Sequence, residues 1–274
     1  VIMGVFQRIG DDIRVTARLI NVRDGTLIST TDSINKYGNL FVLEDSIALN
    51  IIEKLNIKIS DAERAQLKKF IPTNNISAFE FMAKATNAFI SKDIQGAIEF
   101  CKKALEIDSN YIQANSSMAF LYEWSGDILS AKRYYKKALE LSEIRQDKPL
   151  LMVANFNLGR IAFGEWRVKE ALDYHNKALK TAKYLNNLQS YAQILYNLGL
   201  CYIRNNEPKK AKDALLESKK IFEGLKNKFS IAESYLGLGL YYSFGNEMDL
   251  DNAKNNFEQA LKIYEALNSK EGLS

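Results

Sequence analysis

The sequence predicts a mainly α-helical protein: a right-handed α-solenoid of about five helical hairpins, preceded by a truncated α/β unit of three antiparallel strands and a helix. Two observations predict this fold. The pair Leu198-Gly199 recurs 40 residues earlier as Leu158-Gly159 and 40 residues later as Leu238-Gly239, and a fixed period of this size indicates stacked supersecondary units. Near the start of the chain, in contrast, apolar and polar residues alternate with the period of two that is typical of strands.

Three strands are expected before residue 36. In residues 13–19 apolar and polar side chains alternate, as in a strand with one buried face. Gly10 and Gly25 separate this run from residues 1–8 and 26–33, and glycine near such turns supplies the positive φ that hairpins need. The three runs therefore predict an antiparallel sheet of consecutive hairpins.

An apolar stripe after Asn39 predicts a helix of about five turns, which completes the small unit at residues 1–72. Three strands and one helix leave sheet edges that need partners. We therefore expect this unit to be the C-terminal part of an α/β domain, and the chain to be part of a longer protein.

Four short stretches of this unit resemble the end of the TolB-amino-terminal-like or FlgO-like domain of bacterial signalling proteins. They are Gly4-Val5-Phe6-Gln7-Arg8, Arg14-Val15-Thr16-Ala17-Arg18-Leu19-Ile20, Asp24-Gly25 and Phe41-Val42-Leu43-Glu44-Asp45. The resemblance implies a signalling context. No cyclase catalytic residue lies in this chain to be transferred with it.

Residues 77–274 are expected to be helical hairpins, with repeats that start near residues 78, 112, 152, 192 and 232. Ser77 and Glu80 suggest a capping box at the start of the first helix. The pattern resembles the tetratricopeptide repeat, and the matching positions include Phe81, Ala97, Ala104, Met118, Ala119, Tyr122, Ala131, Ala138, Leu158, Gly159, Ala171, Ala178, Leu198, Gly199, Tyr202, Ala211, Leu238, Gly239, Tyr242, Ala253 and Ala260. The 40-residue spacing is similar to that of peptide-binding scaffolds and Rap-type regulators.

The composition argues against several classes of partner and of chemistry. The 274 residues carry 37 basic and 33 acidic side chains, a net charge of +4, so neither a nucleic-acid footprint nor a polybasic membrane patch is expected. Direct membrane insertion is not expected either, because no apolar run approaches about 18–20 residues. Two cysteines and one histidine exclude a disulfide framework and a zinc site built from thiolate and imidazole.

We expect no catalytic residue, no metal site and no cofactor. His175 has no partner nucleophile in the sequence, and a packing or rim histidine is the simpler interpretation than a general base or a pH switch. Cys101 and Cys201 fall at repeat-core positions and should be small buried hydrophobes. The turn at residues 246–252 offers oxygen ligands without the spacing of a calcium loop, which favours a polar turn that caps the next helix.

The candidate binding site is the surface of the first helix of each repeat, which lines the concave groove in the tetratricopeptide pattern. The expected groove residues are Ser116, Phe120, Glu123, Trp124, Phe156, Asn157, Arg160, Phe163, Gln193, Tyr196, Asn197, Leu200, Arg204, Leu236, Leu240 and Phe244. The resemblance implies that Asn157 and Asn197 bind the main chain of a ligand. An amide both donates and accepts hydrogen bonds, which suits an extended peptide of any sequence. The alternative is that these amides satisfy local helix groups and that the aromatic rings are repeat core.

The predicted function is a non-enzymatic scaffold that binds a protein or peptide in the groove, within a larger bacterial signalling protein. A ligand-sensing module that controls an attached catalytic domain is one alternative. Homo-oligomerisation through sheet edges or uncapped repeats is another. The absence of a signal peptide from this sequence suggests a cytoplasmic location.

Overall fold

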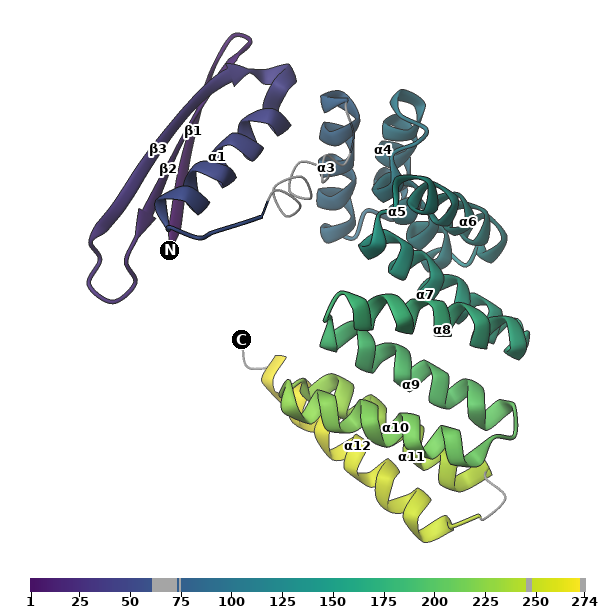
Figure 1. The fold of residues 1–274 in the computed structure, drawn as a ribbon. Coiled ribbons are helices and arrows are strands. Elements are labelled where there is room, and N and C mark those ends of the chain that lie inside the picture. The colour runs from purple at the N-terminus through teal and green to yellow at the C-terminus, as the bar shows by residue number, and fades with distance from the viewer. Residues whose placement is uncertain (61–72, 74, 245–247, 272–274) are drawn as a thin grey trace. The chain divides into compact units, whose positions relative to one another are not determined.

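The computed structural model describes residues 1–60, 73, 75–244 and 248–271. The chain forms two compact units, Val1–Tyr111 and Ile112–Ser274. Three strands and eleven α-helices lie in the described residues, and the later helices stack in a solenoid-like array (Figure 1). This confirms the predicted fold class. The first unit holds the strands together with the first helical hairpin, while the division expected at residues 72–77 stays a prediction.

The sheet has the order β1-β2-β3, with both pairs antiparallel. The strands are β1 (Ile2–Ile9), β2 (Asp12–Ile20) and β3 (Leu27–Lys36). Gly10 and Gly25, in the turns that join them, adopt φ of 59° and 71°, the left-handed backbone that glycine adopts without steric cost. The three predicted strands and their hairpin order are therefore confirmed.

Helix α1 (Leu40–Lys54) covers one face of the sheet, where it packs on β3 and β2 (Figure 1). Phe41 and Leu43 of α1 are buried there, as are Ile13 and Ala17 of β2. Strand β1, in contrast, is exposed at every position. One helix thus covers two of the three strands, and the third is left as an uncovered edge.

The first helical hairpin consists of α3 (Ile76–Ile90) and α4 (Ile94–Ile107). Its N-cap is Asn75, whose side chain accepts hydrogen bonds from the backbone N–H groups of Ser77 and Ala78. The expectation that Ser77 caps this helix was wrong, because the helix already begins at Ile76 and an Asn side chain fills the N-cap role equally well.

The second unit consists of four hairpins. Their helices are α5 (Ile112–Trp124), α6 (Ile128–Arg145), α7 (Lys148–Gly164), α8 (Val168–Tyr184), α9 (Leu188–Arg204), α10 (Pro208–Gly224), α11 (Lys228–Phe244) and α12 (Leu250–Glu271). Helices α7, α9 and α11 begin four residues before the expected starts near 152, 192 and 232. Asp147 and Asn187 cap α7 and α9, so the longer period extends the N-terminal end of each first helix.

A glycine on each of the first helices α7, α9 and α11 makes room for a side chain on the second helix of the same hairpin. A Cβ atom on Gly159 would lie 2.6 Å from His175 Cε1, one on Gly199 would lie 2.6 Å from Leu215 Cγ, and one on Gly239 would lie 2.5 Å from Phe257 Cε1. These distances are too short for a real side chain, so only glycine permits this packing of the helices. The Leu-Gly pair recurs in the sequence because the glycine of each pair makes one of these contacts.

Candidate peptide-binding site

The expected groove residues lie on α5, α7, α9 and α11, the first helices of the four hairpins in the second unit. Within this unit α7 contacts both α5 and α9, and α9 contacts α11. The stacking therefore brings residues that are 40 apart in the chain onto neighbouring helices. This arrangement is what a binding surface across several repeats requires.

A cleft of about 90 Å³ lies between α7 and α9. It is lined by Met152, Val153, Phe156, Ser190, Gln193 and Ile194. Phe156 and Gln193 were expected in the groove, whereas the other four were not singled out from the sequence. The signal that could have indicated them is the apolar spacing of Met152 and Phe156, four residues apart on one helix face.

Glu123 ties α5 to α7. Its carboxylate accepts a hydrogen bond from the Tyr135 hydroxyl at 3.1 Å and pairs with Arg160 Nη2 at 2.8 Å. Burial, together with the neighbouring Glu123 carboxylate, raises the pKa of Tyr135 above its ordinary value. The charge of Arg160 is therefore already matched within the protein.

Asn157 and Asn197 occupy the same register on α7 and α9 but bond differently. Asn197 Nδ2 donates to the backbone oxygen of Gln193 at 2.9 Å, while Asn157 Oδ1 accepts from Arg160 Nη1 at 3.2 Å. One of the two polar atoms of each side-chain amide is thus hydrogen-bonded within the protein. The other half, Asn157 Nδ2 and Asn197 Oδ1, has no hydrogen-bond partner in the described part of the chain, so peptide binding by these amides stays a prediction.

The C-terminal ends of α7 and α9 meet at a stacked cluster that we call the Arg204 corner, formed by Phe163, Trp166 and Arg204. The guanidinium carbon of Arg204 lies 3.7 Å from the centroid of the Phe163 ring and 4.1 Å from that of Trp166. Arg204 Nη1 also donates to the backbone oxygen of Phe163 at 2.7 Å. Trp166 was not predicted, and its signal is its place in the turn, 40 residues from Gly126 and from Asn206.

Several expected groove residues are partly used in packing. The half-buried Phe163 packs against Ala162, Ala171 and Cys201. Burial raises the pKa of Tyr196 to about 12, and its ring lies where a Cβ on Gly237 would approach within 2.8 Å. These two aromatic rings therefore stabilise contacts between elements of the array.

The remaining expected groove residues divide into exposed and half-buried side chains. Phe120 and Trp124 are 40% and 65% exposed, with ring centroids 6.2 Å apart. Phe244 at the end of α11 is also exposed. The half-buried positions are Ser116, Leu200, Leu236 and Leu240.

His175 is a packing residue inside the α7–α8 hairpin. It is fully buried beside Gly159, its ring lies 5.7 Å from that of Phe156, and neither ring nitrogen has a hydrogen-bond partner in the described structure. Burial and the nearby Arg160 charge lower the pKa of His175 to about 4. The prediction of a packing role is confirmed, and the imidazole is neutral at physiological pH.

The two cysteines are buried, as expected for core positions. Burial raises the pKa of Cys101 and of Cys201 to about 12, which keeps both thiols protonated and unreactive at neutral pH. Among the described residues no group of three or more His, Cys, Asp and Glu side chains is placed to hold a metal ion.

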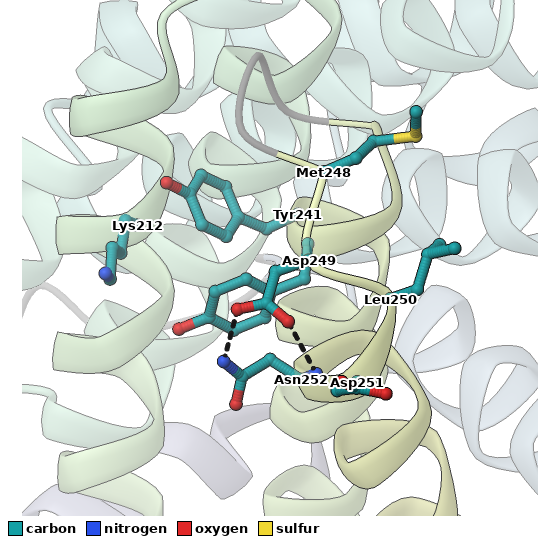
Figure 2. A pocket seen from close by; sticks show the side chains of 8 residues that line it. Lys212, Tyr241, Met248, Asp249, Leu250, Asp251 and Asn252 are labelled. Carbon is teal, nitrogen blue, oxygen red and sulfur yellow. Dashed lines mark hydrogen bonds between the residues drawn. The ribbon is translucent and has the colours of Figure 1, made fainter.

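A second, larger cavity of about 740 Å³ lies at the start of α12 (Figure 2). It is lined by Lys212, Tyr241, Tyr242 and residues 248–252. Asp249 accepts hydrogen bonds from both the backbone N–H and the side-chain amide of Asn252 (Figure 2). The described part of the turn is thus a helix cap, as expected, while residues 246 and 247 of the expected 246–252 turn lie outside the described residues.

Comparison with known families identifies the repeats. Residues 110–183 and residues 192–223 each match a model described as tetratricopeptide repeat. Residues 110–183 and 192–223 are therefore similar to tetratricopeptide repeats, a fold that is generally a non-catalytic scaffold for protein–protein interaction. No helix among the described residues is long and apolar enough to cross a membrane.

Several solved structures are similar to this chain. BtubC (BKLC) from P. vanneervenii has a TM-score of 0.60 at 18% identity, over 85% of this chain and 93% of that one. The apo form of RapI has a TM-score of 0.62 at 19% identity, over 71% and 72%. MamA has a TM-score of 0.51 at 26% identity, over 69% and 92%. The first two show the fold alone.

The resemblance of the N-terminal unit to TolB-amino-terminal-like or FlgO-like domains is not supported. The two family matches cover residues 110–183 and 192–223, outside the stretches that suggested it. Short alternating stretches such as residues 14–20 occur in any sheet with one buried face, so they identify a strand more readily than a family.

Proposed function

We propose that the tetratricopeptide array binds an extended segment of a partner protein across α7 and α9, as a non-enzymatic scaffold within a larger bacterial signalling protein. The observation that supports this most is the cleft between α7 and α9, which lies on the first helices beside the paired Asn157 and Asn197. The cleft accepts an apolar side chain of the segment. The free halves of the two amides bind its main chain.

The chemistry of the cleft fits this role. Val153 is 36% exposed and Phe156 is half-buried, so an entering side chain removes apolar surface from water without moving the helices. Gln193 and Ser190 at the rim supply polar groups, and a pocket with a few polar groups on an apolar floor gives both affinity and orientation. The small volume suits one side chain better than a cofactor.

The proposal is tested by selecting peptides from a randomised displayed library against the whole 274-residue chain and measuring their affinity by calorimetric titration. Val153→Asp places a charge in the cleft and should weaken binding at least tenfold. Val42→Asp, which changes an exposed valine on α1, is the matched control and should leave the affinity unchanged. Equal affinity of the two variants would place the binding surface elsewhere.

Self-association through β1 is a second candidate function, because this strand is uncovered. Val5, Phe6 and Ile9 are 65%, 72% and 70% exposed, and β1 is an edge of the sheet. An apolar edge strand offers unpaired backbone groups to another strand. Sedimentation velocity over a range of protein concentrations tests this, since pairing makes the sedimentation coefficient depend on concentration.

A further inference from the structure

The Arg204 corner holds a cation that has no carboxylate partner in the described structure. Three other cations near this corner are paired with carboxylates: Arg160 with Glu123 at 2.8 Å, Lys132 with Glu165 at 3.2 Å, and Arg167 with Glu165 and Glu170. Arg204 donates only to a backbone oxygen. A guanidinium has five N–H donors, so most of its donors remain open to solvent.

Stacking holds this guanidinium in one orientation. Its central carbon lies over the rings of Phe163 and Trp166, and the hydrogen bond to the Phe163 oxygen further restricts its rotation. An arginine that is already ordered loses little side-chain entropy when it binds a ligand. Its planar fork also matches the geometry of a carboxylate better than a lysine does.

Trp166 has a left-handed backbone conformation that is unfavourable for a bulky residue. Its φ is 61°, and the residues at the same register in the neighbouring hairpins are Gly126, with φ of 85°, and Asn206, with φ of 57°. Gly and Asn adopt this left-handed backbone readily, whereas a bulky side chain is strained there. The ring is nevertheless 74% exposed, so one of its surfaces stays available to a ligand. Exposed Trp and Arg are the side chains that contribute most at interfaces.

We propose that the Arg204 corner binds an acidic side chain of the partner segment, and that the residue beside this acid stacks on Trp166. The inference rests on the proposed function, because it assigns the partner a second contact besides the α7–α9 cleft. The carboxylate balances a charge that the protein leaves unmatched. The partner is accordingly an extended segment that carries both an apolar anchor and an Asp or Glu.

The spacing of these two residues follows from the helix that connects their sites. Gln193 in the cleft and Arg204 in the corner are 11 residues apart on α9, a distance of about 16 Å at 1.5 Å per residue. An extended segment advances about 3.3 Å per residue. The acid therefore lies roughly five residues from the apolar anchor.

The test begins with the peptides selected from the displayed library against the whole chain. The selected sequences should share a large apolar residue and an Asp or Glu about five positions away. One such peptide is then synthesised with Glu, with Gln in its place, and with Glu and an amidated C-terminus. The Glu peptide and its amidated form should bind equally, and at least tenfold more tightly than the Gln peptide.

Variants of the protein test whether the preference for the Glu peptide arises at the Arg204 corner. Arg204→Gln should weaken binding of the Glu peptide at least tenfold. Its affinity for the Gln peptide should stay within twofold of that of the unchanged protein. Lys209→Gln removes the same charge from an exposed site on α10 and should change neither affinity. Trp166→Asn introduces the residue type found at position 206. It should weaken binding of both peptides, while the melting temperature of the protein stays the same or rises.

Four results overturn the inference. If peptides bind through the cleft but show no preference for an acid, or if Arg204→Gln weakens the Glu and Gln peptides equally, Arg204 only stabilises the array and the proposed function stands alone. If only peptides with a free C-terminal carboxylate bind, the acid is not a side chain and the inference is wrong in that form. If no peptide is enriched at all, the proposed function fails, and the inference fails with it.

Discussion

His175 sits where the neighbouring hairpins have Tyr135 and Leu215, against a small residue of the first helix. It is the only one of these three that can acquire a positive charge. In the folded protein its pKa is lowered from 6.5 to about 4. The neutral ring is thus favoured by the fold, and a proton on the ring opposes it.

This residue predicts a loss of stability in acid. The unfolded chain takes up the proton near pH 6.5, whereas the folded chain resists it down to about pH 4. The stabilising contribution is therefore complete above pH 6.5 and falls by about 3 kcal/mol as the pH drops to 4. His175→Leu, which copies the side chain at position 215, should remove this slope and raise stability at pH 7 by about 1–2 kcal/mol, because two buried nitrogens without partners disappear. Urea unfolding at pH 4.5 and pH 7 measures both effects, and an unchanged slope in the variant would contradict the assignment.

Two glycines of the array should respond oppositely to the same substitution. Gly199→Ala places a Cβ 2.6 Å from Leu215 Cγ and should destabilise the protein by about 1–3 kcal/mol through overpacking. Gly199→Leu should unfold this hairpin altogether. Gly224, the last residue of α10, faces open space, and Gly224→Ala should be neutral or stabilise by about 0.5 kcal/mol. Equilibrium urea unfolding of the two alanine variants gives the comparison directly.

At the level of elements, α7 and α9 act together through residues at the same register. The double change Asn157→Ala/Asn197→Ala removes both amides, and each lost hydrogen bond to the peptide should cost about 1–3 kcal/mol of binding. Affinity for a selected peptide should therefore fall at least tenfold. The fold should be retained, since Ala favours a helix more than Asn does. Calorimetric titration tests the loss, with Asn176→Ala/Asn255→Ala on the exposed surfaces of second helices as the control. Equal affinity in the two double variants would show that the amides serve only their own helices.

The exposed edge strand β1 is the expected contact for self-association, and a charge placed on it should prevent pairing. Val5→Lys places a charge in the middle of the uncovered edge and should abolish any concentration-dependent self-association, because a buried lysine opposes strand pairing. Val22→Lys changes another exposed valine, in the turn after β2, and should leave self-association intact. Sedimentation velocity distinguishes the two. Identical behaviour would exclude β1 as the contact.

Across the whole molecule, the elements were predictable and the contacts between hairpins were not. The 40-residue Leu-Gly period indicated the repeats, and the alternation in residues 13–19 indicated the sheet, because each signal arises within one element. The starts of α7, α9 and α11 were placed four residues late, since the caps Asp147 and Asn187 lie before the periodic core residues. The α7–α9 cleft and the stacking of Arg204 on Phe163 join residues about 40 positions apart. Their geometry depends on how neighbouring hairpins stack, which the pattern within one repeat does not contain.

The glycine contacts also bear on how such an array changes its length over evolutionary time. In three successive hairpins the larger residue follows the small residue by 16 positions: Gly159 and His175, Gly199 and Leu215, and Ala119 and Tyr135, which share one buried cluster. A recombination that removes or duplicates 40 residues from this region therefore leaves a small residue opposite a larger one, wherever the break falls. The array can grow or shrink by whole hairpins without a new core having to arise. In the last hairpin, Gly239 and Phe257 are 18 positions apart, so an exchange with that hairpin would shift the contact by two residues and be selected against.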